Sequence, residues 1–415
     1  MSTWTYTASN EANLMKIKYG KLIEDQFNKE NVLFARTKVK EDFVGSQLDM
    51  PVIQSIGGGV AAGSLPTANE NKIGKATLSP KKLYAVISVD RETMKASKTD
   101  EGAFVRFTAF PVKIAVDSFN RNLERMLTVG DATGTGALIT GNGSNSVVTG
   151  AGTSCSPYVI TFDASGVYYD TDGAAFEEGD LINVNTETTD LEVVTIATTT
   201  TSVTLSVTGT SSRLATLAAG CGTAFGASDK LYMQNSKDNE MVGIRGAISA
   251  TSSTLYGITV GRRRQAYQKN ASSAALTTDL INEMVIKVKQ QSGKAPKMVL
   301  TSYLQYIKLL NLLEDQKRFP IPARRADVSF EAVQIMTPEG AIPVIASRFV
   351  PADEMFFLND DHIELHLRPG GMEWFDEDGT VFLRETGDSY EARYGGYGQT
   401  FINPHFQGYL HTLAT

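Results

Sequence analysis

The run from residue 103 to residue 129, AFVRFTAFPVKIAVDSFNRNLERMLTV, constrains the fold more than any other stretch. Its large apolar side chains recur mostly at steps of three and four, which places them along one side of a helix. They are Phe104, Phe107, Phe110, Ile114, Phe119, Leu123, Met126 and Leu127. At ~1.5 Å per residue this helix would be about 40 Å long. Its pattern ends at Gly130, and Pro111 either kinks it or marks its true start. So long a helix, crossed by sheets and loops, is the first indication of an architectural protein.

The composition excludes several classes of function. The chain has 415 residues, a net charge of −7 and 20% charged residues, so there is no global electrostatic reason for it to grip nucleic acid. Cys155 and Cys221 are too few for a disulfide framework, although one bridge between them stays open. The N-terminus lacks a basic segment followed by an apolar run, and no stretch approaches about 18 uninterrupted apolar residues. We therefore expect neither a secretory signal nor a membrane span.

The chain before the long helix predicts an arm followed by a protruding hairpin. Residues 11–27 have the pattern of an amphipathic helix, and residues 48–56 that of a strand, which Pro51 confines to a sheet edge. Residues 82–90, KLYAVISVD, predict a second strand. Between the two strands, residues 57–75 contain almost no large apolar side chain, and a loop this long without a core is either functional or disordered. Pairing with a neighbouring subunit would explain the missing core, and a flexible surface hairpin is the plainer alternative.

After the long helix, the composition changes to one typical of β-structure. Between residues 158 and 233 the fraction of Thr and Val residues is higher, the fraction of charged residues is lower, and apolar residues alternate with polar ones. Strands are predicted at residues 158–162, 181–184, 191–196, 203–207 and 231–233. These features predict a small antiparallel β module, a barrel or sandwich inserted into a larger domain.

The remaining chain returns to mixed α and β. Residues 277–291 predict a helix with Thr277 or Thr278 as N-cap, and residues 302–314 a second helix opened by Ser302. A buried strand at residues 297–300 lies between them. From residue 355 to the end the sequence is rich in strands.

Motifs that would carry catalysis or metal binding are lacking. The run HIELH does not have the HExxH spacing, and its alternation predicts a strand with His362, Glu364 and His366 on one face. We favour a polar, solvent-facing strand there over a metal site, because no fourth ligand is visible; His405 and His411 stand apart. The glycines of GTG at residues 134–136 follow a helix rather than a strand, which excludes a dinucleotide fingerprint. We expect no catalytic, cofactor or metal site, and no enzyme activity.

Glycines and basic residues are the candidates for contacts between subunits. The lysines gather at the hairpin, where they either keep an exposed loop soluble or meet a neighbour's carboxylates. The arginines lack the interleaved aromatic residues of single-strand binders, so inter-subunit salt bridges or pore-lining charges are favoured over nucleic-acid contact. The candidates are Gly57, Gly58, Gly59, Lys72, Lys75, Lys81, Lys82, Arg262, Arg263, Arg264, Arg324 and Arg325.

The order of these elements resembles that of the major capsid proteins of tailed bacteriophages, which have the Hong Kong 97-type fold. The stretches that carry the resemblance are LMKIKYGKLIEDQFNKENVLF, the GGG hairpin leading into KLYAVISVD, and NRNLERMLTVGDATGTGALI. Further on, KMVLTSYLQYIKLLNLL is similar to the helical part of the axial domain of that fold, and AIPVIASRFVPADEMFFLN to its sheet.

The resemblance implies an α+β fold with six parts. They are an N-terminal arm (residues 1–47), an extended loop hairpin (48–90), a peripheral domain with the spine helix (91–150), an inserted barrel-like β domain (151–240), an axial domain (241–354) and peripheral closing strands (355–415). The tip of the extended loop would be residues 57–75, and the apolar side of the spine helix would pack on the closing strands. No residue matches a crosslinking motif that could be carried over.

The resemblance also implies a function and partners. Copies of the chain would form pentamers and hexamers of an icosahedral or prolate head shell around double-stranded DNA, in the virion, with only non-specific DNA contact and no membrane. A separate scaffolding protein, a portal and a decoration protein are the expected partners. The alternatives are a nanocompartment (encapsulin-type) shell of the same fold, a β-rich phage tail or surface protein and, with least support, an enzyme. Deletion of residues 57–71 should spare folding and prevent closure of a shell.

Overall fold

The structure is a computed structural model. It describes residues 32–55, 72–90, 109–130, 139–140, 147–149, 157–163, 176–198, 202–219, 229–251, 254–259, 261, 264–314, 333–375, 383–384 and 389–414. The predicted helix at residues 11–27 therefore lies outside the described residues, as do residues 57–71 of the predicted hairpin tip, whereas residues 72–75 of that tip belong to a strand, Lys72–Leu78. Compact units can be recognised: one holds Met1–Lys29, Ala85–Phe119 and Trp374–Tyr394, and the other Glu30–Tyr84, Asn120–Glu373 and Gly395–Thr415. The division into six domains stays a prediction.

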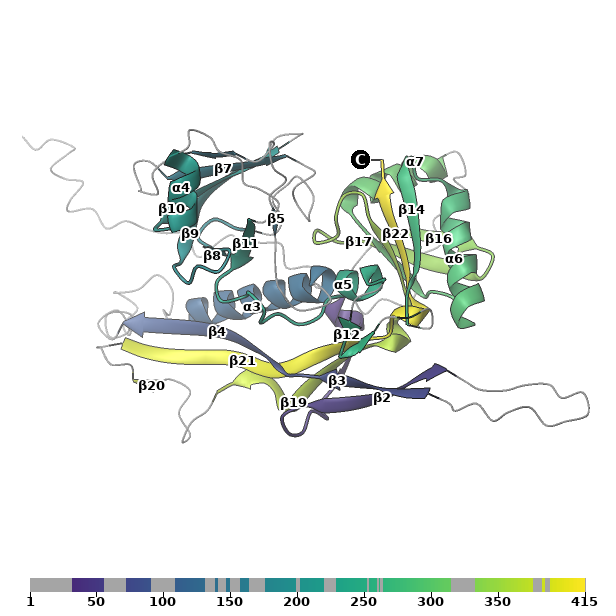
Figure 1. Cartoon of the computed structure of the whole chain (residues 1–415), viewed down its shortest axis with the longest axis horizontal. Helices are drawn as coiled ribbons and strands as arrows, with labels where there is room; N and C mark the ends of the chain where they lie inside the picture. The colour runs from purple at the N-terminus through teal and green to yellow at the C-terminus, as the bar shows by residue number, and fades with distance from the viewer. Residues whose placement is uncertain are drawn as a thin grey trace, which may run out of the picture. The chain divides into compact units, whose positions relative to one another are not determined.

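The long helix α3 is described from Ala109 to Val129 (Figure 1). Pro111 lies in its first described turn, and the helix continues past it to Val129 without a break. Phe119 packs its ring edge-on against Tyr394 with 5.1 Å between the centroids, which agrees with the predicted contact between the spine and the closing strands. The helix ends at Gly130, whose N–H donates to the carbonyl of Met126 over 3.0 Å.

One sheet combines the start of the described chain with its end. Its strands run in the order β1 (Lys38–Lys40), β19 (Ile363–Trp374), β21 (Ser389–Ile402) and β20 (Leu383–Arg384), and β4 (Lys81–Asp90) also pairs with β21. On β4, Leu83 and Ile87 are buried, whereas Tyr84 and Val86 are exposed. This is the alternation predicted for KLYAVISVD, and it leaves one face of the strand for a core.

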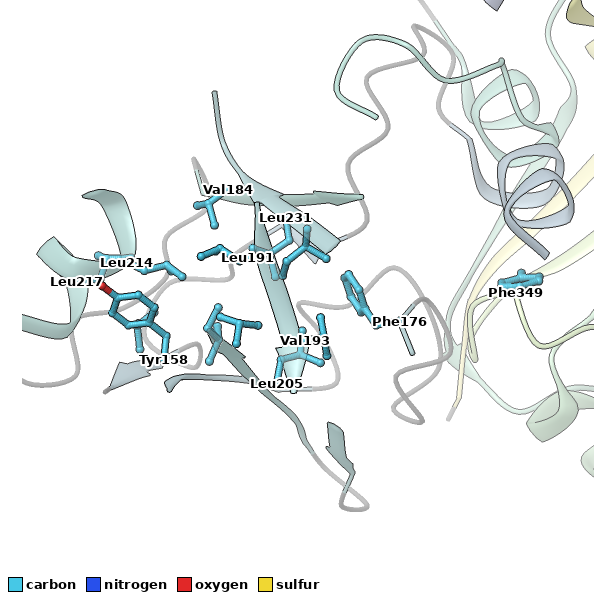
Figure 2. Packing of buried hydrophobic residues seen from close by; sticks show 14 residues of the cluster. Tyr158, Phe176, Val184, Leu191, Val193, Leu205, Leu214, Leu217, Leu231 and Phe349 are labelled. Atoms are coloured by element: carbon cyan, nitrogen blue, oxygen red, sulfur yellow. The ribbon is translucent and has the colours of Figure 1, made fainter. Parts of the chain in front are cut away.

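A seven-stranded sheet lies between α3 and the rest of the chain in sequence. The order is β5 (Ile139–Thr140), β11 (Lys230–Met233), β8 (Leu181–Val184), β9 (Leu191–Thr198), β10 (Ser202–Gly209), β7 (Tyr158–Asp163) and β6 (Val147–Thr149). All of its pairs are antiparallel, and the five predicted strands are confirmed. The helix α4 (Ser212–Ala219) was not predicted. Figure 2 shows the core of this sheet, in which Leu191, Leu205 and Leu214 are fully buried.

A second core lies on a six-stranded mixed sheet. Its strands follow the order β14 (Tyr267–Ala274), β22 (Gly408–Leu413), β18 (Met355–Leu358), β15 (Met298–Thr301), β17 (Gly340–Ala346) and β16 (Val333–Thr337). Helices α6 (Thr278–Ser292) and α7 (Tyr303–Glu314) pack against this sheet (Figure 1). The hydroxyl of Thr277 accepts the N–H of Leu280, which confirms one of the two predicted caps. Residues from 355 onward thus contribute to this sheet as well as to the sheet of β19–β21.

The remaining elements are short. Strands β2 (Leu48–Ser55) and β3 (Lys72–Leu78) form an isolated two-stranded ribbon, and β12 (Thr254–Leu255) pairs with β13 (Ile258–Thr259). The prediction that residues 48–56 and 82–90 are the two strands of one hairpin is wrong, because β2 pairs with β3 and residues 82–90 belong to β4, which pairs with β21. Single turns of helix are found at η1 (Phe34–Arg36), α5 (Ile244–Ser249), η3 (Asp360–His362) and η4 (Pro404–Phe406). We call residues 32–55 and 72–78 together the arm-and-ribbon segment.

Candidate functional site

The ribbon leaves apolar side chains in solvent. Ile53 of β2 and Ile73 of β3 lie directly opposite each other, and they are 60% and 69% exposed. Polar pairs hold the register: Lys75 lies 2.7 Å from Asp49, which also accepts the hydroxyl of Thr77 over 2.9 Å. The pKa of Asp49 is accordingly lowered, chiefly by its hydrogen bond from Lys75. Two strands alone cannot bury both of their faces, so this surface is available to another molecule.

The base of the ribbon is anchored to the β12–β13 hairpin. The N–H of Thr77 donates to the carbonyl of Tyr256 over 2.9 Å, and Ala76 and Leu78 are fully buried. At Gly74 a Cβ would lie 3.0 Å from Cδ1 of Ile258 and closer still to the side chain of Gln54, so a larger residue would require these side chains to shift. The ribbon is therefore fixed at one end.

The arm is held by a carboxylate of the spine helix. Glu124 is fully buried, and its two carboxylate oxygens accept the N–H groups of Leu33 over 2.7 Å and Phe34 over 2.9 Å. These are the orphan donors at the start of η1, which has no side-chain cap of its own. Burial raises the pKa of Glu124 to about 7, although the backbone donors oppose the shift. The attachment of the arm therefore contains a group that titrates near neutral pH.

The next residues of the arm add a strand to the sheet of β19. Strand β1 pairs in parallel with β19, with Lys38 opposite Glu364 and Lys40 opposite His366. Lys38 lies 2.9 Å from Asp361, and Lys40 lies 2.8 Å from Glu364. These pairs are largely exposed, so each contributes little by itself, but they select this register for the arm.

The prediction of a solvent-facing histidine strand is wrong for both histidines of the run. His362 belongs to η3 and stacks on Phe406 with 3.7 Å between the ring centroids. His366 is fully buried, because the arm covers it: its Nδ1 lies 2.6 Å from the carboxylate of Asp42. Within the part of the chain that the structure describes, no group of three or more His, Cys, Asp or Glu residues is arranged to hold a metal ion.

Five of the twelve predicted contact residues lie in the part of the chain that the structure describes. Gly57, Gly58, Gly59, Arg262, Arg263, Arg324 and Arg325 lie outside the described residues. Lys72 starts β3, Lys75 pairs with Asp49, Lys82 is exposed, and Nζ of Lys81 donates to the carbonyl of Asp238 over 2.6 Å. Arg264 is buried, with 3% of its surface exposed. Contact of any of these residues with a neighbouring subunit stays a prediction.

The spine helix carries arginines that form ion pairs with residues outside the helix. Arg121 lies 3.0 Å from Asp180 and 3.4 Å from Glu177, and Arg348 lies 3.1 Å from the same Glu177. One turn along the helix, Arg125 pairs with Glu240 over 2.5 Å. These contacts join α3 to the segments that precede β8 and follow β11, and no single pattern in the sequence predicts them.

A second apolar surface runs along α7. Tyr303, Ile307 and Leu310 are 40%, 55% and 41% exposed. Their spacing of four and three residues places them on one side of the helix, opposite the fully buried Leu309 and Gln305. The helix therefore presents an apolar stripe to solvent as well as to its own sheet.

Comparison with known proteins gives a family match and a fold. Residues 223–399 match the family model of the SU10 major capsid protein, which is less than half of the chain. Comparison with curated proteins gives no match. Among solved structures, the cyanophage A-1(L) capsid asymmetric unit has 12% sequence identity and a TM-score of 0.58, over 99% of this chain and 100% of that chain.

The capsid of the native GTA particle, computed with C5 symmetry, has 10% identity and a TM-score of 0.53 over 100% of both chains. The chain has the fold of a phage capsid protein. This confirms the α+β, Hong Kong 97-type fold predicted from the sequence. The encapsulin of the holo-SrpI complex from Synechococcus elongatus PCC 7942 is also similar, with 7% identity over 99% of this chain and 96% of that chain, but its TM-score of 0.48 is too low to argue from.

In this capsid fold, no helix among the described residues is long and apolar enough to cross a membrane.

Proposed function

We propose that this chain is a major capsid protein, whose copies assemble through pentamers and hexamers into an icosahedral or prolate head shell that encloses double-stranded DNA. The capsid fold and the match of residues 223–399 to a major capsid protein family support the proposal. The observation that carries it is the arm-and-ribbon segment, which is firmly attached at its base yet exposes the opposed pair Ile53 and Ile73.

The ribbon serves to bury its apolar pair on a neighbouring subunit. Removal of apolar surface from water yields roughly 25 cal/mol per Å², and a ribbon without a core of its own gains this only from another chain. Contacts of identical chains around five-fold and six-fold axes are heterologous and close into rings. Total burial per subunit belongs to the obligate class, above ~2,000 Å².

The stripe on α7 serves contacts nearer the capsomer centre. The resemblance assigns this helix to the axial domain, and Ile307 is the most exposed of its three apolar residues. A stripe of this kind suits a helix that packs against the same helix of the next copy in a ring. The exposed lysines of the ribbon, Lys75 among them, form the polar rim of the neighbouring contact.

The remaining partners follow from the same role. A separate scaffolding protein guides assembly, a portal occupies one vertex, and a decoration protein binds the outer surface. Contact with the packaged DNA is non-specific, because a subunit of net charge −7 provides no strong attraction for phosphate. The chain catalyses no reaction, and its place is in the virion.

Particle size tests the proposal directly. The chain, purified alone and after co-expression with a candidate scaffolding protein, is expected to form capsomers or closed shells in negative-stain microscopy and rapid sedimentation. A variant that lacks residues 57–71 should keep its melting temperature and fail to close shells. A wild-type chain that stays monomeric in every condition contradicts the proposal.

The contents of the particles separate the shell alternatives. Particles isolated from infected cells should contain double-stranded DNA. Particles filled instead with an enzyme would favour the nanocompartment alternative, and tubes or fibres would favour a tail or surface protein. Only the first outcome agrees with a head shell.

A further inference from the structure

The ribbon of β2 and β3 contains two strands, so each strand has one edge that the other strand does not cover. A ribbon of this kind is marginally stable at best by itself. An uncovered edge presents N–H and C=O groups that can pair with a further strand. The register of the ribbon decides which of the two edges is able to do so.

The paired residues show which backbone groups point out of the ribbon. Asp49 lies opposite Thr77, and Pro51 lies opposite Lys75. The N–H of Thr77 donates to the carbonyl of Tyr256, outside the ribbon, so Asp49 and Thr77 form a pair without mutual hydrogen bonds. Because such pairs occur at every second position of an antiparallel ladder, the N–H and C=O groups of Lys75 point outward as well.

Only the edge of β3 keeps all of its donors. On β2, Pro51 occupies an outward-facing position and has no N–H to donate. On β3, the outward positions before Thr77 are Ile73 and Lys75, and no carbonyl of the described backbone accepts the N–H of either residue. Ile73 is 69% exposed, and the side chain of Lys75 is 63% exposed, so this edge is open to solvent.

We propose that the outer edge of β3 binds an extended segment of a second copy of this chain as a third strand. This inference rests on the proposed function, since a shell of identical subunits offers a neighbouring copy for every ribbon. The added strand continues the edge at which Thr77 already bonds to Tyr256. It runs beside Ile73, and its side chains help to cover the exposed pair of Ile73 and Ile53.

A map of the assembled shell tests the inference at the atomic level. The N–H groups of Ile73 and Lys75 should donate to backbone carbonyls of a neighbouring copy. A strand added to β2 instead, a strand supplied by another protein, or an edge of β3 that still faces solvent overturns the inference.

Hydrogen exchange distinguishes the two edges in solution. When subunits assemble, the amides of residues 72–78 should gain protection, because the outward N–H groups of β3 acquire acceptors. The amides of residues 48–55 should exchange at nearly the same rate before and after assembly. Equal gains on both strands would mean that assembly covers the ribbon without adding a strand to β3, and the inference would fail.

A proline at position 75 removes one of the outward donors. Lys75→Ala is the matched control, because it loses the same ion pair with Asp49 but keeps the N–H. Since this N–H lies outside the ladder of the ribbon, the melting temperatures of Lys75→Pro and Lys75→Ala should agree within about 1 °C. The concentration needed for shells should be about tenfold higher for Lys75→Pro than for Lys75→Ala, as expected for the loss of one hydrogen bond.

The outcomes are distinct. If Lys75→Pro melts well below Lys75→Ala, the N–H is bonded within the subunit and the inference fails. If the two variants assemble equally well, the inference fails while the proposed function stands. A wild-type chain that never assembles overturns both.

Discussion

The seven-stranded sheet and the arm-and-ribbon segment are stabilised in different ways. The sheet buries a cluster of its own apolar residues, such as Leu191 and Leu205, between strands that are near one another in sequence (Figure 2). The arm-and-ribbon segment depends on residues far along the chain: Leu33 and Glu124 are 91 positions apart, and Lys38 and Asp361 are 323 apart. A region with its own core can be stabilised by contacts within itself. A region without a core needs contacts with the rest of the subunit and then with a neighbouring subunit.

The largest effect is expected in the core of the seven-stranded sheet. Leu205→Ala should lower the free energy of unfolding by about 4 kcal/mol, because it opens a cavity at a fully buried position. Val194→Ala, on an exposed position of the same sheet, should change it by less than about 0.5 kcal/mol. Hydrogen exchange should show faster opening of β7–β11 with β15–β18 unchanged. Equal opening of both would mean that the sheet has no stability of its own.

The next largest effect concerns the attachment of the arm through Glu124. Its folded pKa of about 7 lies above the ordinary 4.5, so the folded state binds an extra proton between these values. Glu124 makes its whole contribution to the free energy of unfolding below pH 4.5. This contribution, about 3 kcal/mol at most, is lost as the pH rises towards 7. The glutamine of Glu124→Gln cannot titrate. The free energy of unfolding of this variant should therefore rise relative to that of the wild type as the pH increases from 4.5 to 7, which urea unfolding at several pH values measures.

Glu187, in the connection between β8 and β9, is the control for that pH dependence. Burial alone would raise its pKa, but hydrogen bonds from Ser211, Ser212 and the N–H of Arg213 together lower it. A lowered pKa gives stability that is present above pH 4.5 and is lost as the pH falls, so Glu187→Gln should show the opposite slope. Identical slopes for the two variants would show that burial does not govern Glu124.

Local patterns predicted the regular elements, and long-range polar contacts escaped prediction. The helix α6 could be predicted, because its apolar period and its cap at Thr277 lie within a few residues. The helix α4 was missed because it is short and stands in a Thr- and Ala-rich run that resembles the strands beside it. The hairpin was predicted with the wrong second strand: residues 72–75 were expected in the loop but begin β3, which pairs with β2, whereas residues 82–90 belong to β4 and pair with β21.

The polar contacts that attach the arm could hardly be predicted from the sequence. Glu124 lies next to the apolar side of the spine helix, three positions before Leu127, which is the only indication that it is buried. The pairing of Asp42 with His366 joins positions 324 apart and cannot be inferred without the pairing of β1 with β19. Arg264 was singled out as part of a basic run, yet only the structure shows that it lacks a partner among the described residues.

A smaller effect is expected where the spine helix meets the seven-stranded sheet. Arg121→Ala removes contacts to Asp180 and Glu177 that are mostly buried, and it should cost about 1–2 kcal/mol in denaturant unfolding. Lys269→Ala, which breaks an exposed pair with Glu283, should cost less than about 0.5 kcal/mol. If the two variants cost the same, the ion pairs on Arg121 do not fasten the sheet.

The smallest effect on the subunit is expected at the exposed end of the ribbon. Ile53→Ser removes an apolar side chain that is 60% exposed, so the free energy of unfolding should change by less than about 0.5 kcal/mol. Assembly should nevertheless suffer, because the same side chain becomes buried only when a neighbour covers it; sedimentation of wild-type and variant shells measures this. Val194→Ser, at a comparably exposed position of the seven-stranded sheet, provides the control and should leave assembly unchanged. If both variants assemble as the wild type does, the ribbon is not an interface. The arm-and-ribbon segment would then not differ from the seven-stranded sheet by burying its apolar side chains on a neighbouring subunit.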